Sequence, residues 1–320
     1  MPRSTVAPLV LRHFLLLGGL LSASLFTGCS TVKRAAVDTL ADTLSSAGTT
    51  YATDEDPELI RQATPFSLKL MESTLEQAPR HEALLLACCR GFTQFGYAFV
   101  AQDADELEAR DFTAAGDQRA RARKLFLRAR SYGLRGLEVT TPGVTADLAR
   151  DPLAAVRRFS RKDVPLLYWT AASWAAAVGL SKDDPSLVSE IPQLEALIDR
   201  ALALDESWGE GSIHSFLITY EMSRQGIAGD PALRSRAHYE RAVALSQGLL
   251  AGPHLAWAES VCVECRDAAG FDQAIVKALA INPDAAHAHR LENLIVQRRA
   301  RWLQGRRDEL FLPAAKPRTP

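Results

Sequence analysis

Two cysteines three positions apart come closest to a known chemical motif. Cys262 and Cys265 form a Cys-x-x-Cys pair, a spacing used for disulfide exchange or for half of a four-ligand zinc shell. No second Cys-x-x-Cys and no His-x-x-x-His completes such a shell. Both cysteines also fall on the apolar stripe of an expected helix. Cβ atoms three residues apart on a helix are separated by about 5–6 Å, whereas a disulfide needs roughly 3.8 Å. The spacing therefore favours structural thiols, with a redox function as the alternative.

Other catalytic signatures are absent from the sequence. It contains no nucleophile elbow, phosphate loop, His-Glu-x-x-His or glycine-rich dinucleotide fingerprint. The histidines are scattered, and the close pair His287 and His289 would point to different faces of a helix. We therefore expect a protein that is not an enzyme and needs neither a cofactor nor a metal.

Cys29 carries a different kind of chemistry, because it closes an N-terminal export signal. Arg3 and Arg12 precede an apolar run over residues 14–25, which is shorter than the ~20 residues of a membrane-spanning helix. A cysteine at the first mature position accepts a lipid. Ser30 follows it instead of the aspartate that retains lipoproteins at the inner membrane. We expect a periplasmic protein lipid-anchored to the outer membrane; the alternative is a secreted protein with a chance cysteine.

The charge balance limits the partners. The chain has 37 basic and 38 acidic residues, a formal net charge of -1. Such a chain has no basic excess to bind nucleic acid or an anionic membrane surface. Its expected membrane contact is therefore through the lipid anchor only.

One group of aromatic residues could contact a ligand. Large rings surrounded by alanine and serine could line an apolar cleft, although such rings more often fill a helical core. The residues of this candidate ligand cleft are Tyr168, Trp169, Ser173 and Trp174.

A group of arginines could contact a partner. Arg298, Arg299 and Arg301 lie near the end of the last expected helix, where the helix dipole favours positive charge on a solvated face. The alternative is a docking site for an acidic partner or for lipid head groups.

The elements that would position these groups are helices. Alanine and leucine are abundant, and apolar residues recur at spacings of three and four, as in the stripe that includes Leu84, Cys88, Phe92 and Phe95. Aspartate followed by proline is a helix-start signal, because aspartate caps free amides and proline lacks one. This dipeptide begins at Asp56, Asp151, Asp184 and Asp230.

A weak internal repeat indicates how the helices are arranged. Similar segments align on Ala201, Ala242 and Ala278, at intervals of 41 and 36 residues, and a looser copy contains Ala129. The tetratricopeptide period is about 34 residues. The sequence thus predicts an all-α fold, an α-solenoid of degenerate tetratricopeptide-like helical hairpins, in preference to an unrelated helical bundle.

The predicted organisation has four parts. Residues 1–28 form the signal peptide and residues 29–55 a lipidated tether, with one short helix near Val37–Leu44. Residues 56–304 form the helical domain, and residues 305–320 a C-terminal tail.

Several segments resemble those of one known family. They are Tyr168–Ala177 running on to Lys182–Pro185, Phe216–Glu221, Ala258–Val261 and Asn293–Trp302. Together they resemble TatT, a family of lipoproteins associated with TRAP transporters, over about Val37 to Trp302. The resemblance implies degenerate tetratricopeptide-like hairpins, a homotrimer, and partnership with the periplasmic solute-binding subunit of a tripartite ATP-independent transporter. It also implies an apolar or amphipathic ligand in a cleft or pore, and it supplies no catalytic residues.

Three functional hypotheses follow. The first is a non-enzymatic periplasmic lipoprotein that docks the solute-binding subunit and shelters an apolar small ligand. The second is a scaffold lipoprotein for outer-membrane or pilus assembly. The third is a thiol-dependent enzyme that uses Cys262 and Cys265.

Overall fold

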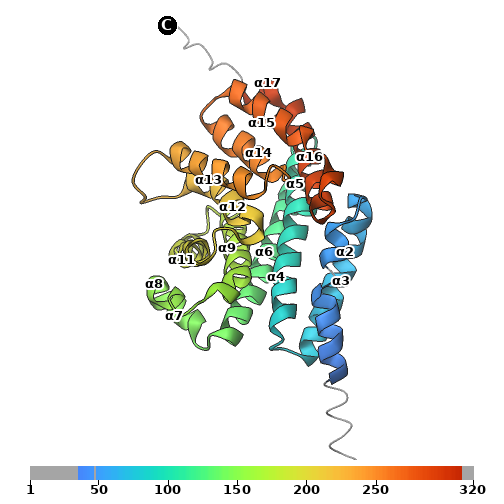
Figure 1. The fold of residues 1–320 in the computed structure, drawn as a ribbon, viewed down its shortest axis with the longest axis vertical. Coiled ribbons are helices and arrows are strands. Elements are labelled where there is room, and N and C mark those ends of the chain that lie inside the picture. Colours follow the sequence, from blue (N-terminus) through green and yellow to red (C-terminus); the bar gives the residue numbers. More distant parts are fainter. Residues whose placement is uncertain (1–34, 47, 312–320) are drawn as a thin grey trace, which may run out of the picture.

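The computed structural model describes residues 35–46 and 48–311 (Figure 1). Helices and their connections account for these residues, and none of the described segments is a β-strand. The expected all-α class is therefore confirmed. The predicted signal peptide, residues 1–28, and Cys29 lie outside the described residues. The short helix expected near Val37–Leu44 is present, as residues 35–46.

The first half of the fold runs from the N-terminal helices to the aromatic-rich helix α9. Its elements are α2 (Gly48–Ala52), α3 (Pro57–Gln77), α4 (Glu82–Gly96), η1 (Tyr97–Ala101), α5 (Gln102–Leu107), α6 (Phe112–Thr140), α7 (Val144–Arg150), α8 (Pro152–Val156), η2 (Arg161–Asp163) and α9 (Val164–Gly179). The segment η1 is a π-helical turn that continues α4 into α5.

The second half contains the aligned repeats. Its elements are α10 (Pro185–Val188), α11 (Ile191–Leu204), η3 (Trp208–Gly211), α12 (Ser212–Ser223), α13 (Pro231–Leu245), α14 (Gly252–Ala256), η4 (Trp257–Cys262), α15 (Ala268–Ala280), η5 (Pro283–Ala285), η6 (His287–His289), α16 (Arg290–Gly305) and α17 (Arg307–Leu310). The segment η4 is a second π-helical turn, which follows α14.

The aspartate–proline pairs begin helices as predicted. Asp56, Asp151, Asp184 and Asp230 are the N-caps of α3, α8, α10 and α13, and each is followed by proline in the first turn. In all four, the aspartate side chain accepts hydrogen bonds from backbone amides of the new helix, as at Ala154 after Asp151. Local sequence thus sets these helix starts without help from the rest of the fold.

Small residues let α6 run close to its neighbours. A side-chain carbon at Gly133 would collide with Thr170 of α9 and lie 3.0 Å from Cys89 Sγ of α4. A carbon at Gly136 would collide with Leu166 of α9. Close packing at these glycines makes α6 the helix between α4 and α9 (Figure 1).

The aligned alanines occupy equivalent places. Ala201, Ala242 and Ala278 lie in the last turns of α11, α13 and α15, and all three are fully buried. Each of these helices is followed by a second one, α12, α14 with η4, or α16, with which it makes contact. The pairing of helices agrees with the repeat, and the assignment to a tetratricopeptide-like solenoid stays a prediction.

The last long helix returns to the beginning of the fold. Figure 1 shows α16 beside α2 and α5, and α16 contacts both α2 and α3. The segment expected to be a tether also joins the fold, because Ala41 is fully buried in the first hydrophobic cluster and Leu44 and Tyr51 pack against it. Residues far apart in the sequence are therefore neighbours at this junction.

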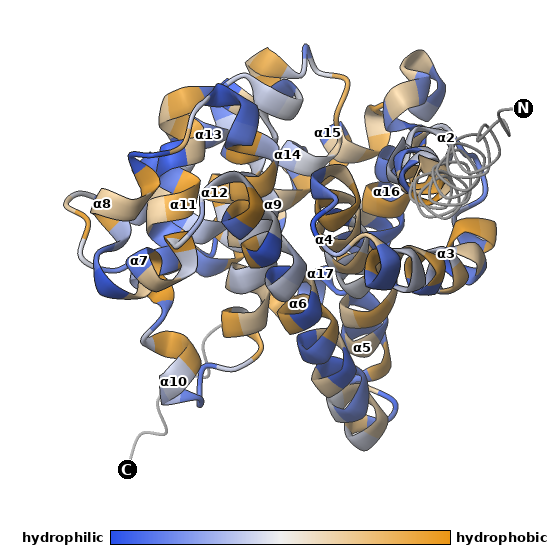
Figure 2. Cartoon of the chain, turned by 90° about the horizontal axis from the view of Figure 1, so that it is seen from below, coloured by the Kyte–Doolittle hydropathy of each residue, from blue (hydrophilic) through white to orange (hydrophobic). Residues whose placement is uncertain are grey.

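One long apolar helix meets the length and composition of a membrane span. It covers Glu82–Leu107, and 67% of its most apolar window is buried inside the fold. That burial is the pattern of a core helix, and Figure 2 shows α4 enclosed by other helices. Within residues 35–46 and 48–311 it is the one helix with this length and composition.

Candidate functional site

Five aromatic side chains from three elements form a continuous group. We call them the aromatic wall: Tyr168 and Trp169 of α9, Trp208 of η3, and Phe216 and Tyr220 of α12. The ring of Tyr168 lies 5.0 Å from that of Trp169 and 4.8 Å from that of Trp208, measured between centroids. Phe216 stacks on Tyr220 at 5.4 Å. All five rings are half-buried, so part of each remains open to water or to a ligand.

An unusual backbone segment sets the place of Trp208. The three residues after it, Gly209, Glu210 and Gly211, all have positive φ angles, of 57°, 54° and 91°. For Glu210 this conformation costs on the order of 1 kcal/mol or more, and such strain clusters at functional sites. His289 of η6 holds the segment, since its Nε2 atom lies 2.9 Å from a carboxylate oxygen of Glu210.

A carboxylate lies at the same end of the fold. Glu292 is exposed and belongs to the first turn of α16, three residues after His289. Desolvation raises the pKa of Glu292; the charge of His289 lowers it in part, and the charge of Glu210 adds to the rise. Desolvation also raises the pKa of the Tyr168 hydroxyl, and the charge of Glu292 contributes. The carboxylate of Glu292 and the ring of Tyr168 therefore lie close enough for their charges to interact.

Tyr97, on the π-helical turn η1, is also exposed to solvent and also has a raised pKa. It is 52% exposed, yet burial raises the pKa of its hydroxyl to about 12, and the charge of Glu259 contributes. Glu259 belongs to the other π-helical turn, η4. π-Helical turns are rare and often occur at functional sites. The two in this fold bring Tyr97 and Glu259 toward the same region.

The residues predicted for a ligand cleft divide into two pairs. Tyr168 and Trp169 belong to the aromatic wall. Ser173 and Trp174 lie in the core, with 0% and 5% of their surfaces exposed. Trp174 donates to Glu190 at 3.0 Å, and Ser173 donates to the carbonyl of Thr170 at 2.9 Å. Only Tyr168 and Trp169 are therefore open enough to contact a ligand.

Sequence reasoning missed Trp208, Phe216 and Glu292 as members of this region. Phe216 lies in a segment that carries the family resemblance, yet nothing marked it as a neighbour of Tyr168, 6.4 Å away between ring centroids. Tertiary packing brings these residues together, and one sequence alone holds no signal for that proximity.

The three predicted docking arginines also differ from one another. Arg298 donates to Asp103 at 2.7 Å and to Glu106 at 2.8 Å, both in α5. Arg299 is 6% exposed and donates to Asp105 at 2.9 Å and to Glu259 at 3.2 Å. The interpretation of a solvated face is therefore wrong for Arg299.

The paired arginines and their carboxylates form a group that we call the ionic junction. Its six side chains are Arg298, Arg299, Asp103, Asp105, Glu106 and Glu259. They connect α16 to α5 and η4. Arg301 is exposed and is the member of the predicted trio whose side chain the fold leaves accessible.

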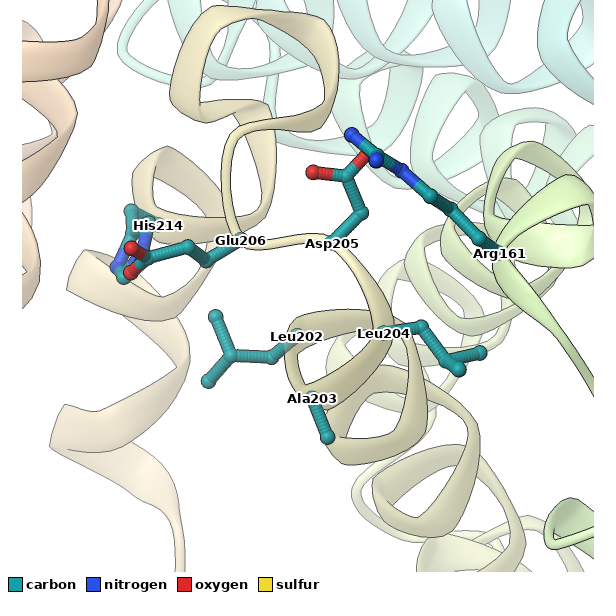
Figure 3. A pocket seen from close by; sticks show the side chains of 7 residues that line it. All are labelled: Arg161, Leu202, Ala203, Leu204, Asp205, Glu206 and His214. Carbon is teal, nitrogen blue, oxygen red and sulfur yellow. The ribbon is translucent and has the colours of Figure 1, made fainter.

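A shallow depression of about 500 Å³ lies elsewhere, at the end of α11 (Figure 3). Its polar side chains are paired within the chain. Arg161 binds Asp205 at 2.9 Å, and Glu206 lies 3.3 Å from His214. His214 also shares a 2.8 Å hydrogen bond with His238. Burial lowers the pKa of both imidazoles. A ligand there would have to displace existing pairs, so this depression is the weaker candidate.

The cysteines give no sign of a redox or metal site. Cys262 is buried and Cys265 is exposed, so the expectation that both lie on the buried stripe is wrong for Cys265. Cys265 lies after η4, in the turn where this helix ends, and therefore leaves the buried face. Burial raises the pKa of Cys262 to about 12, so its thiolate is scarce near neutral pH. Within the described ranges no group of three or more histidine, cysteine or acidic residues is arranged to hold a metal.

Comparison with known proteins adds two findings. The family model described as "TRAP transporter T-component" matches residues 53–311. A protein of Treponema pallidum (strain Nichols), itself described as an uncharacterized protein, is 29% identical over 309 residues. The alignment covers 91% of this chain and 95% of that relative. The family match contains the aromatic wall, Glu292 and the ionic junction.

Proposed function

The chain belongs to the TRAP transporter T-component family, and we propose that it docks the transporter's solute-binding subunit and shelters an apolar or amphipathic small ligand. Family membership makes it an accessory component of such a transporter. The proposal that the chain shelters a ligand rests on one observation, the aromatic wall. Each of its five half-buried rings keeps part of its apolar surface exposed.

Ligand binding at the wall follows from elementary energetics. Removing apolar surface from water contributes roughly 25 cal/mol per Å². Rings that are already partly packed lose little side-chain freedom when a ligand arrives, so most of that contribution remains available. The wall can therefore bind a ligand without forming a covalent bond, and we propose that the protein is not an enzyme.

A second surface is suited to contact between copies of the chain. Three exposed apolar side chains, Leu59, Phe66 and Leu70, lie on one face of α3 at spacings of seven and four. Phe66 is 73% exposed. We propose this stripe as the contact in a homotrimer, and Arg301 as part of the surface that meets the solute-binding subunit.

Membrane attachment is proposed through the lipid on Cys29, at the periplasmic face of the outer membrane. The near balance of charge over the whole sequence supports this arrangement, because the chain has no net basic excess to hold an anionic bilayer. Attachment would then bring the domain into the compartment where solute-binding subunits work. Mass spectrometry of the N-terminal peptide from the mature protein tests the acylation: an unmodified Cys29 would refute it.

Co-purification from detergent-solubilised envelopes tests the docking proposal. We expect a tagged full-length chain to retain the solute-binding subunit encoded beside it, and Arg301→Glu to retain less. A matched control is Arg236→Glu, which replaces an exposed arginine on α13. Recovery of outer-membrane or pilus assembly proteins in place of that subunit would favour the scaffold function and refute docking.

A further inference from the structure

We infer that the ligand is an amphipathic cation, whose apolar part lies on the aromatic wall and whose charged head meets Glu292. This inference rests on the proposed sheltering of a ligand. It adds the charge of that ligand, which neither the family nor the relative specifies.

The first argument is that Glu292 lacks a partner of its own. The described residues offer this exposed carboxylate neither an ion pair nor a hydrogen bond. Other carboxyl groups with displaced pKa values, among them Asp103, Glu221 and Asp272, have lower values because arginines pair with them. Glu292 is the exception, with a raised pKa. A partially desolvated carboxylate without a cation is favourably completed by one.

The second argument is that Glu292 and the wall belong to one surface. The His289–Glu210 contact of 2.9 Å ties η6 to η3. Glu292 follows His289 by three residues, and Trp208 precedes Glu210 by two, so this contact joins the segments that carry Glu292 and Trp208. The charge of Glu292 also acts on the hydroxyl of Tyr168 and raises its pKa. Trp208 in turn lies against Tyr168 at 4.8 Å. Glu292 also reaches the start of α14, since a side-chain carbon at Gly252 would lie 3.6 Å from its Oε1 atom.

The third argument is the chemistry of the aromatic wall and of the carboxylates beside it. An aromatic face attracts an ammonium group through its quadrupole, and Trp and Tyr are the best such faces. Two carboxylates, Glu210 and Glu292, give the neighbourhood a negative potential. The two basic residues nearest Glu292 in sequence already have partners: Arg290 pairs with Asp284 at 2.8 Å, and His289 contacts Glu210 at 2.9 Å. The combination attracts an organic cation and repels a fatty-acid anion of the same length.

Binding of matched ten-carbon probes tests this inference. The protein is the chain lacking residues 1–29, which keeps all four buried clusters because the first of them begins at Ala41. The probes are decyltrimethylammonium, decyl maltoside and decanoate, each below its micelle-forming concentration, titrated by calorimetry at pH 7.5 and low salt. We expect the ammonium probe to bind about tenfold more tightly than decanoate, a difference that corresponds to ~1.4 kcal/mol.

Two substitutions identify the groups responsible. Glu292→Gln keeps the shape of the side chain and removes the charge, so we expect it to abolish the preference for the ammonium probe. Trp208→Leu should weaken the binding of all three probes. The control Glu240→Gln changes an exposed carboxylate on α13 and should leave the affinities for all three probes unchanged. Circular dichroism of each variant verifies that it is folded.

The outcomes separate the inference from the function on which it rests. If the three probes bind equally, or decanoate binds best, the ligand is not a cation, while sheltering of apolar molecules is retained. If Glu292→Gln keeps the preference, Glu292 is not the group that meets the head. If no probe binds, both the inference and the sheltering proposal are refuted.

Discussion

The ionic junction and the aromatic wall use charge in opposite ways. At the junction, Arg298 and Arg299 of α16 are both paired with carboxylates of this chain. At the wall, the carboxylate of Glu292 on the same helix has no such pair among the described residues. The contrast is notable because the three residues lie on one helix, within two turns of each other.

This comparison separates the charges that stabilise the fold from those that are available to bind an external partner. A charge that is buried and paired cannot change partners cheaply, because breaking the pair leaves the other member without compensation. A charge that is accessible and unpaired can take an external partner. We therefore assign the junction to closing the C-terminal helices onto the N-terminal ones, and the wall with Glu292 to ligand contact.

The largest effect is expected from removing the most buried charge of the junction. Arg299→Met leaves Glu259 without its partner and removes one of the two arginines that pair with Asp105, and we expect it to lower the free energy of unfolding by about 3 kcal/mol. Urea denaturation followed by circular dichroism measures the change. The matched control is Arg301→Met, two residues away on the same helix and exposed, which should stay within about 0.5 kcal/mol of the wild type. Equal effects of the two substitutions would refute the assignment of the junction.

Acid should weaken the junction. Burial alone would raise the pKa of Asp103, but its hydrogen bonds and charge interactions with Arg61 and Arg298 outweigh burial and hold that pKa below its ordinary value. A carboxyl group with a lowered pKa in the folded state stabilises the fold above its unfolded pKa, about 3.9, and loses that contribution as the pH falls through the folded value. We expect urea midpoints to decline below about pH 4.

Asp103→Asn provides the control for the acid effect. The variant should be less stable at pH 7 and should lose less stability than the wild type on going to pH 3. An identical slope in both proteins would show that other carboxyl groups cause the decline.

The exposed stripe of α3 should contribute little to the stability of one chain. Phe66→Ser removes a side chain that is 73% exposed, so the free energy of unfolding of the monomer should change by about 0.5 kcal/mol or less. The same substitution should convert the proposed trimer to monomer, as measured by light scattering. A wild-type chain that is itself monomeric at tens of micromolar, or a variant that stays trimeric, would refute the proposed contact.

Local features were predictable from the sequence, and contacts between distant residues were not. The caps at Asp56 and Asp230 and the burial of Ala201 and Ala242 follow from residues within one turn of helix. Tyr168 was identified as a candidate, but its neighbour Trp208 is 40 residues further along the chain. No local pattern records a contact of that kind.

The arginines of α16 also show that the sequence does not reveal contacts between distant residues. A cluster of like charges at a helix end is typical of a solvated surface, and that pattern correctly describes Arg301. It fails for Arg299, because the carboxylates that pair with it come from α5 and η4. The sequence contains those carboxylates, but only the fold places them beside α16.

The most direct test of the contrast is the stability of Glu292→Gln at pH 7. A carboxylate with a raised pKa in the folded state costs stability once it is ionised, so removing its charge should leave the urea midpoint unchanged or raise it slightly. A loss of more than about 1 kcal/mol would show that Glu292 supports the fold as the junction charges do, and would contradict its assignment to a ligand.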